Sequence, residues 1–400
     1  MRHTINLFLL FTLLTGTLVW TGNAQAIPVF ARKYGFQCTM CHAAFPRLND
    51  FGLRYRENGY QLPGRENDER TVFESPAPIA FRTMAGYTDG RLSSGGEKVR
   101  QFQVSGFDVL SGGLLNRDIG YILGYAPRLE GGRGLVDQPG TLDLANVIFT
   151  NVCGSPYLNI RPGRIEGAYT AFSVQRQLTL APYEIYNFSF PGGVTFAGTQ
   201  TGIELTGHSW NGGWRYAAGL VNGAGTNAAD DPPEDLYIRG AMVFGRGEGQ
   251  TSGQRLGLTG YLGKARPEGV PAAPRENFHR WGVDASLNFS QLNLALQYLT
   301  ASDNGALWGA ASAVKYTGGF AELNYYPSTS LVGFLRYDLV NAPDNVDVGD
   351  ISRWTIGGRY YFIDHLAFHL EFSRRRETVV IPVPGVNREN FLTARLDYAF

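Results

Sequence analysis

Three residues near the N-terminus, Cys38, Cys41 and His42, have the types and spacing that covalent haem attachment requires. They form the pattern C-x-x-C-H, in which two thiols separated by two residues bond to the two vinyl groups of one porphyrin. The adjacent histidine can then present its imidazole to the iron as the proximal axial ligand. The motif therefore predicts one covalent haem c, attached through Cys38 and Cys41 and ligated by His42.

Two other uses of this cysteine pair remain open from the sequence. Cys38 and Cys41 could form a disulfide, which an exported protein can maintain, or a thioredoxin-like redox pair. No βαβ pattern surrounds the motif, and this disfavours the redox fold. The third cysteine, Cys153, lies in the turn sequence Cys-Gly-Ser-Pro and is expected to be a lone thiol.

A second axial ligand would have to come from elsewhere in the chain, because Met40 lies inside the attachment loop. We take Met84 as the distal candidate, since it follows the haem segment closely and its strand pattern turns it inward. A thioether ligand would raise the reduction potential. A filled sixth site favours outer-sphere electron transfer, whereas an open one permits substrate chemistry. Two other candidates are poorly placed, because Met242 is predicted to face lipid and His279 to lie at the external end of its strand. The remaining candidates are His208, His365 and His369.

The first 26 residues read as a secretory signal peptide. Arg2 and His3 precede an apolar run from Leu7 to Trp20, and Ala24-Gln25-Ala26 supplies small residues for cleavage after Ala26. The alternative is a membrane anchor, but the run is shorter than the ~20 residues of a spanning helix. We therefore expect an exported mature chain.

Residues 27–76 are predicted to form the monohaem cytochrome c segment. Within it, Phe45, Leu48, Phe51 and Tyr55 are spaced three or four apart, which predicts a helix from Ala43 to Asn58 that ends at Gly59. About 50 residues can bury only part of a porphyrin. We expect this aromatic stripe to pack against the haem and the rest of the chain to cover its other side.

Residues 77–400 are predicted to form an outer-membrane barrel. Lys+Arg and Asp+Glu both number 35, which argues against a nucleic-acid partner bound by a basic field. Glycine accounts for 51 residues and aromatics for 13%, which suits short strands with tight turns better than disorder or a helical bundle. From about Ile79 the sequence alternates apolar and polar residues, as in Leu331 to Leu339. Only a closed barrel could place such strands in lipid.

The connections between these strands separate a barrel from a soluble sandwich. The pattern predicts sixteen antiparallel strands joined alternately by tight turns, such as Ser209-Trp210-Asn211, and long loops, such as Ala171 to Gly198. Short periplasmic turns, long external loops and an even strand count are typical of outer-membrane barrels. The last strand ends in Phe400, as in many bacterial outer-membrane proteins. The predicted strands begin near residues 79, 99, 118, 142, 157, 199, 212, 235, 255, 279, 292, 312, 330, 352, 366 and 391.

The haem segment also resembles a known family. The runs Ile27 to Gly35, Cys38 to His42, Phe45 to Asn49, Phe51-Gly52 and Gly59-Tyr60, followed by Pro63-Gly64, resemble the fused outer-membrane monohaem cytochrome–porin family, which includes iron-oxidising cytochromes. The resemblance implies a haem c held by Cys38, Cys41 and His42, located in the outer membrane of a Gram-negative bacterium. The haem segment would be periplasmic or inside the barrel lumen. The match is specific only over residues 27–64 and the last strand.

Two functions follow from these observations. In the first, the protein carries single electrons between an extracellular donor, with Fe(II) as the candidate, and a periplasmic c-type cytochrome. This would be Fe(II):cytochrome c oxidoreductase-type chemistry, although whether the protein is an enzyme stays open. In the second, the barrel is a porin-type transport channel and the haem segment is a plug or redox sensor. Outer-membrane lipid is a partner in both. The acidic sequence around Asp230-Asp231 and Glu234-Asp235 could attract cations or be merely solvated.

Overall fold

The computed structural model describes residues 29–62, 64, 69–74, 78–91, 98–129, 140–223, 231–245, 253–343, 345–379 and 385–399. The predicted signal peptide lies outside these residues. Within them, sixteen strands form one closed barrel in which every pair of neighbours is antiparallel, as the sequence predicts. No helix in the described ranges is long and apolar enough to cross a membrane.

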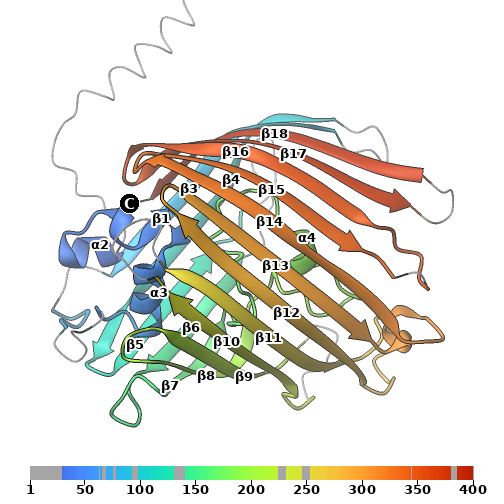
Figure 1. The fold of residues 1–400 in the computed structure, drawn as a ribbon, viewed down its shortest axis with the longest axis horizontal. Coiled ribbons are helices and arrows are strands. Elements are labelled where there is room, and N and C mark those ends of the chain that lie inside the picture. Colours follow the sequence, from blue (N-terminus) through green and yellow to red (C-terminus); the bar gives the residue numbers. More distant parts are fainter. Residues whose placement is uncertain are drawn as a thin grey trace, which may run out of the picture.

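The barrel strands follow one another around the wall, and the last strand pairs with the first (Figure 1). Asn390 of the final strand lies opposite Arg91 of the first, and Ala399 lies opposite Arg82. The strands are β3 (Ile79–Arg91), β4 (Lys98–Asn116), β5 (Ile119–Ala126), β6 (Thr141–Phe149), β7 (Asn159–Ile165), β8 (Gln200–His208), β9 (Trp214–Val221), β10 (Asp235–Phe244), β11 (Gln254–Ala265), β12 (Glu276–Phe289), β13 (Leu292–Asp303), β14 (Val314–Ser328), β15 (Leu331–Asn341), β16 (Ile351–Ile363), β17 (Leu366–Val379) and β18 (Gly385–Ala399).

The predicted strand positions agree with these bounds except at the end of the chain. The first fifteen strands begin within three residues of the predicted positions, but β18 begins at Gly385 rather than near residue 391. The first residues of β18 are polar and include Arg388, and they pair with the last residues of β17 in an antiparallel hairpin. This pairing lies in a polar stretch, where no apolar alternation marks the strand.

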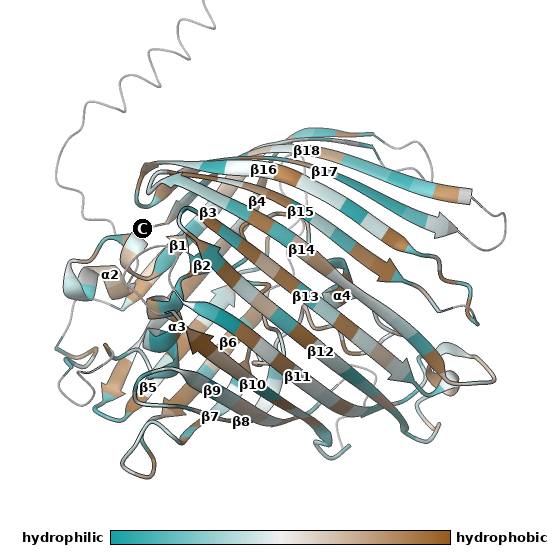
Figure 2. Ribbon diagram, in the orientation of Figure 1, coloured by the Kyte–Doolittle hydropathy of each residue, from teal (hydrophilic) through white to brown (hydrophobic). Residues whose placement is uncertain are grey.

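The wall has an apolar outer face and a polar inner face, as period-two strands of a membrane barrel require. On β15, Leu331, Leu335 and Leu339 are exposed, whereas Arg336 and Asp338 are fully buried. Hydrophobic and hydrophilic residues alternate along the strands (Figure 2). This arrangement confirms the alternation predicted for this strand.

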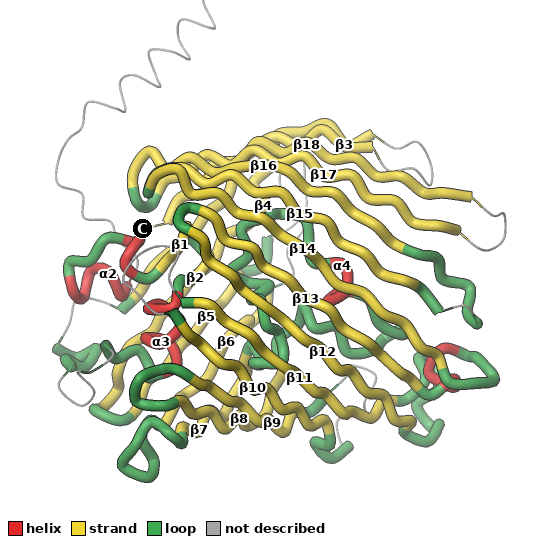
Figure 3. The backbone as a smooth tube through the Cα atoms, in the orientation of Figure 1, coloured by secondary structure: helices red, strands yellow, loops and turns green. Residues whose placement is uncertain are grey.

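The lumen is occupied by two segments. One is the N-terminal plug, residues 29–62, which holds α2 (Val29–Tyr34), the 3-10 turn η2 (Cys38–Met40), β1 (His42–Ala44), β2 (Arg47–Leu48) and α3 (Asp50–Glu57). The other is the inward loop, residues 166–199, which holds α4 (Glu184–Asn187). A second 3-10 turn, η3 (Gly305–Trp308), lies in the connection between β13 and β14. The plug lies at one end of the barrel, and the inward loop runs through the interior (Figure 3).

The inward loop packs mainly through aromatic rings. Tyr183 stacks on Phe320 of the wall with ring centroids 4.2 Å apart, and Tyr169 meets Tyr237 at 5.0 Å. These rings belong to a large buried cluster that joins the loop to strands β7 and β9 to β16. The loop therefore fills this part of the barrel with a packed core.

Candidate functional site

The cysteine motif is held in a fixed turn by Asn49. The amide nitrogen of Cys41 donates to the carbonyl of Cys38, which closes the 3-10 turn between the two thiols. The side-chain amide of Asn49 donates to the carbonyls of Thr39 and Met40, at 3.3 and 3.0 Å, and its backbone nitrogen donates to the carbonyl of Cys41. One residue thus fixes the path of the attachment loop.

Helix α3 begins at the same asparagine. The Oδ1 of Asn49 accepts a hydrogen bond of 2.9 Å from the amide of Gly52, which caps the helix. A Cβ on Gly52 would collide with the Cys41 carbonyl, so only glycine allows α3 to pack this closely on the motif. The cysteine loop and helix α3 therefore form one unit.

The predicted helix from Ala43 is wrong over its first seven residues. Residues 42–48 form the short hairpin β1–β2, and α3 begins only at Asp50. Pro46 lies between the two strands and cannot donate the backbone hydrogen bond that a helix interior needs. The predicted end at Gly59 is confirmed, because this residue has a φ of 66°.

The aromatic stripe makes contacts within the plug and with the wall. Tyr55 is buried against Phe30 and Tyr60, with ring centroids 5.3 and 6.1 Å apart. This cluster reaches Ile122 on the barrel wall. Phe45 belongs to the hairpin and lies 5.2 Å from the His42 ring. These contacts hold α2 and α3 of the plug together and join the plug to the wall.

Neither thiol of the motif forms a disulfide. Burial, with a smaller contribution from Asp364, raises the pKa of Cys38 to about 12, and burial raises the pKa of Cys41 to about 11. A thioredoxin-like pair needs the opposite, a thiol whose pKa is lowered toward neutrality. Cys153 is also free and lies exposed in the turn after β6, as expected.

His42 has the protonation state and tautomer that an iron ligand needs. Its Nδ1 lies 3.1 Å from the carbonyl of Pro46 and donates to it, which leaves the lone pair on Nε2. Burial lowers the pKa of His42 to about 4, and the nearby Arg176 contributes to this shift. A metal-bound histidine commonly donates its other ring nitrogen to a backbone carbonyl in this way. The residues present therefore fit a covalent haem c.

Side chains of the wall hold the plug in the mouth of the barrel. The amide of Cys38 lies 3.3 Å from Asp364 in the short β16–β17 turn, and the Tyr361 hydroxyl donates to the carbonyl of Phe45 at 2.6 Å. On another side, Asn58 contacts His208 at 2.6 Å. The motif thus lies at the short-turn end, where the C-terminal strand also ends (Figure 1).

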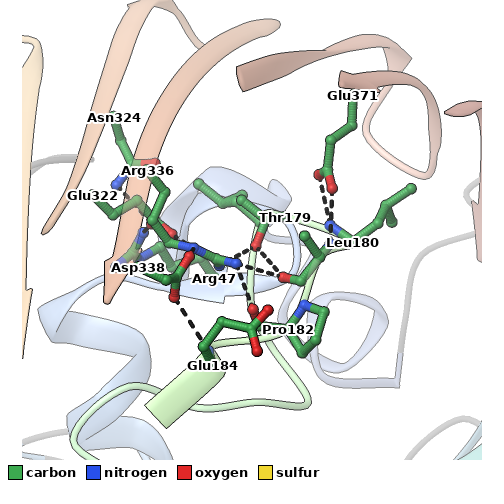
Figure 4. A network of polar contacts seen from close by, with 12 residues as sticks. Arg47, Thr179, Leu180, Pro182, Glu184, Glu322, Asn324, Arg336, Asp338 and Glu371 are labelled. Atoms are coloured by element: carbon green, nitrogen blue, oxygen red, sulfur yellow. Dashed lines mark hydrogen bonds and ion pairs between the residues drawn. The ribbon is translucent and has the colours of Figure 1, made fainter. Parts of the chain in front are cut away.

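The plug and the inward loop share a buried network on β14 and β15 (Figure 4). Arg47 of the plug pairs with Glu322, which also faces Arg336 at 3.6 Å. Arg336 donates to the carbonyls of Ala181 and Pro182, both at 2.7 Å. The two segments that fill the lumen are therefore joined through one glutamate of the wall.

The candidates for a second axial ligand lie in different environments. Met84 faces the lumen, because it pairs with the buried Asp397 across the β3–β18 ladder. Arg82, two residues earlier on the same face, has its guanidinium 5.8 Å from the Phe45 ring. The inward direction predicted for Met84 is thus observed, and ligation by it stays a prediction.

The other candidates divide by their surroundings. Both ring nitrogens of His208 lie within hydrogen-bond distance of protein oxygens, at 3.0 and 2.6 Å, so it has no free nitrogen for iron. His369 is buried with Nε2 3.2 Å from Glu371. Met242 is 66% exposed on the outer face, as predicted. The remaining two are His279, exposed on β12, and His365, half-buried in the β16–β17 turn beside Tyr398.

The acidic sequence before β10 has basic partners in the part that the structure describes. Asp231 pairs with Arg266, and Glu234 pairs with Lys264 at 3.0 Å. Asp235 is buried and accepts from the Tyr261 hydroxyl at 2.7 Å. The ion pairs of Asp231 and Glu234 oppose the cation-attracting interpretation, and burial keeps Asp235 away from solvent cations. Asp230 lies outside the described residues.

Comparison with known structures identifies the architecture. The anion-selective porin of Comamonas acidovorans superposes with a TM-score of 0.60 at 13% identity, covering 80% of this chain and 99% of that porin. The chain has a porin fold. The outer-membrane channel DcaP of Acinetobacter baumannii gives 0.58 at 9% identity over 82% and 99% of the two chains, and Salmonella typhi OmpF gives 0.55 at 11% over 80% and 97%.

The sequence comparisons are narrower. The family "Phosphate-selective porin O and P" matches residues 266–400, about a third of this porin-fold chain. No curated protein matches the sequence. The three structural superpositions leave about a fifth of the chain without a counterpart. These findings support a porin-type barrel and do not address the cytochrome part of the resemblance.

Sequence reasoning missed the residues that position the motif. Asn49 and Gly52 stood within the family-like runs, but neither had a role assigned to it. An asparagine one residue before an acidic helix start is an N-cap signal, and it could have identified both Asn49 and the true start of α3. The wall partners Tyr361 and Asp364 follow the motif by more than 300 residues. Local patterns give no signal for such contacts.

Proposed function

We propose that this porin-type barrel lies in the outer membrane of a Gram-negative bacterium and carries a haem c in its plug for electron transfer. The geometry at His42 carries the proposal, because its Nδ1 is fixed by the Pro46 carbonyl and Nε2 keeps its lone pair. A haem c held by Cys38, Cys41 and His42 would exchange single electrons with its partners. The candidate partners are an extracellular donor such as Fe(II) and a periplasmic c-type cytochrome.

The chain's own residues would position and shield this group. Asn49 fixes the attachment loop, and Asp364 and Tyr361 hold the motif against the wall. Cys38 is buried, which limits access of water to its side of the motif. The short-turn end carries the motif and would face the periplasm by the usual orientation of bacterial barrels.

A solute channel is the second candidate function. The porin fold and the porin family match support a channel more directly than they support electron transfer. In this case the plug would close the pore, and the ion pairs between the plug and the wall would control opening of the pore. Arg215 of the wall strand β9 makes two such ion pairs with the plug helix α3, one with Asp50 and one with Glu57 at 3.4 Å.

Two measurements on the purified protein separate these functions. For electron transfer, we expect Fe(II) to reduce the haem without added mediators, as followed by its absorption spectrum, and planar bilayers to show little conductance. Arg215→Ala should raise the conductance by loosening the plug, whereas the exposed Arg100→Ala should not. An open-porin conductance in the unmodified protein, with no haem reduction by Fe(II) or any stronger reductant, would contradict the proposal.

The orientation of the barrel in the membrane can be tested separately. If the short-turn end is periplasmic, protease added to intact cells should cut long loops at the opposite end and spare the Ser209–Asn211 turn. Cleavage within that turn would reverse the topology.

A further inference from the structure

One sector of the outer face of the barrel is strongly basic. It lies on the four neighbouring strands β17, β18, β3 and β4, at the end away from the plug (Figure 1). On β17, Phe368, Leu370 and Phe372 are exposed on the apolar outer face. The next two outward residues of this strand, Arg374 and Arg376, are exposed as well. We call the five exposed cations at this end of the four strands the basic surface: Arg91, Lys98, Arg374, Arg376 and Arg388.

The strand register places like charges next to one another on this surface. Arg91 of β3 lies directly opposite Lys98 of β4. In the same way, Arg376 of β17 lies directly opposite Arg388 of β18. Like charges that face each other across two strands destabilise the sheet. An anion bound between these strands would relieve the repulsion.

Acidic residues on the same face do not balance the basic surface. Asp89 of β3 is the one carboxylate among the described outward positions of these four strands, and it lies 3.1 Å from a sixth exposed cation, Arg100. That pair is neutral, so the basic surface keeps all of its positive charge. Across the barrel, the outward Lys264 of β11 has its own acidic partner, Glu234, at 3.0 Å. The excess of positive charge therefore belongs to the sector formed by β17, β18, β3 and β4.

The height of these cations on the wall matches the surface of a membrane. A tilted strand crosses the hydrocarbon core in about 9–11 residues. Counted from Leu366, the ninth and eleventh residues of β17 are Arg374 and Arg376. Trp354 lies opposite Arg374, and its ring is 4.5 Å from that of Tyr337, as in the aromatic girdles that mark membrane interfaces. Because arginine on the lipid face is costly in hydrocarbon but not at the interface, we place the basic surface at the level of the lipid headgroups.

We propose that the basic surface binds the phosphorylated headgroup of a lipid in the outer leaflet of the outer membrane. Clusters of Lys and Arg at a membrane surface attract anionic lipids, and guanidinium groups suit the oxygens of their phosphates. The acyl chains of such a lipid would contact the exposed apolar residues next to the cations, such as Phe372 and Leu392. This continuity of charge with an apolar face favours a lipid over a soluble acidic partner.

The inference goes beyond the proposed function. It rests on the outer-membrane location and on the orientation that places the short turns in the periplasm. It does not rest on the haem or on electron transfer.

Native mass spectrometry of the purified full chain in detergent tests the surface, with bis-phosphorylated lipid A as the added lipid. Arg374→Gln/Arg376→Gln removes two cations of the basic surface. Lys264→Gln/Lys315→Gln is the matched control, because it removes two outward cations at the same end of β11 and β14. Arg374→Lys/Arg376→Lys keeps the charge. Heat-modifiable migration on gels verifies that every variant is a folded barrel.

We expect the affinity for lipid A to fall about tenfold or more in Arg374→Gln/Arg376→Gln, because each cation near a membrane surface contributes to the binding of anionic lipid. The charge-keeping variant and the matched control should bind as the unmodified protein does. Lipid A without its phosphates should bind the unmodified protein about tenfold or more weakly.

Four results would overturn the proposal. The first two are an equal loss of affinity in the matched control and equal binding of the two forms of lipid A. The third is displacement of the lipid by inorganic phosphate beyond that caused by sodium chloride of equal ionic strength, which would indicate a site for small anions. The fourth is a changed oligomeric state of lipid-free Arg374→Gln/Arg376→Gln, which would assign the surface to a second copy of the chain.

These readouts are independent of the other hypotheses. None of them involves the haem, so a failure here leaves the electron-transfer hypothesis untested by this experiment and unchanged. The orientation is decided by the protease experiment on intact cells, so an inverted barrel and a missing lipid site give different results.

Discussion

The two segments that fill the barrel are held in different ways. The inward loop has an extensive aromatic core with the wall, such as Tyr183 on Phe320, in addition to ion pairs at Glu184, whereas the plug combines smaller apolar contacts with the wall and polar contacts such as Asn58 with His208. Apolar packing is insensitive to pH and charge, but ion pairs and hydrogen bonds are not. The comparison predicts that conditions or mutations loosen the plug, which has the smaller apolar contact with the wall, before they loosen the inward loop.

The largest expected effect concerns the chemistry that only the plug carries. Cys38→Ala/Cys41→Ala should lose all covalent haem, because no other thiol is adjacent in the motif, while the barrel still folds. Pigment that resists acid–acetone extraction, measured by absorption, checks this. Cys153→Ala is the matched control and should keep the full haem content. Haem retained by the double variant would refute the attachment site.

The next effect concerns the network that joins the two segments. Arg336→Ala leaves the buried carboxylate of Asp338 without its cation and Glu322 with Arg47 as its only cation, so we expect the barrel to lose about 3–5 kcal/mol of stability. Urea unfolding in detergent, followed by gel migration, measures the loss. The exposed pair Arg100–Asp89 provides the control, and Arg100→Ala should cost no more than about 1 kcal/mol. Equal losses would remove the distinction between buried and exposed pairs.

A pH effect should follow in the haem-free plug. The pKa of His42 falls from 6.5 to about 4 on folding, so the unfolded segment binds the proton more tightly. Stability is therefore full above pH 6.5 and falls as the pH drops toward 4, by about 3 kcal/mol in all. Protease sensitivity of the plug in Cys38→Ala/Cys41→Ala, measured between pH 7 and 4, should rise accordingly. His42→Gln in the same background should flatten this part of the profile, and an unchanged profile would contradict the assignment.

The smallest expected effect separates the two roles of Asn49, which caps helix α3 and donates hydrogen bonds to the attachment loop. Asn49→Ala loses the helix cap and two donated bonds, so the Gly52 amide should exchange with solvent about tenfold faster, equivalent to about 1–2 kcal/mol. Asn49→Asp keeps the cap oxygen and loses only the donors, so Gly52 should stay protected. Hydrogen exchange by mass spectrometry gives both values. Similar exchange in the two variants would mean that the cap contributes little.

The fold was predictable because a barrel wall has a strict period of two, and Leu331 to Leu339 displays it in consecutive residues. The cysteine motif was predictable because its residues are adjacent in sequence. The true start of α3 was missed because spacing alone gave more weight to Phe45 and Leu48 than to Pro46. The contacts between the lumen segments and the wall could not be derived, since pairs such as Arg47 with Glu322 join residues 275 positions apart.

The seam between β18 and β3 has a consequence for assembly. The strand that follows the plug in sequence, β3, pairs with β18, so the wall closes only after β18 has joined the sheet. Until that moment the plug is tethered to an open sheet edge. Assembly of the barrel therefore includes a step in which β18 pairs with β3 and encloses the plug. A chain truncated before β18 would leave the cysteine motif at the edge of an open sheet.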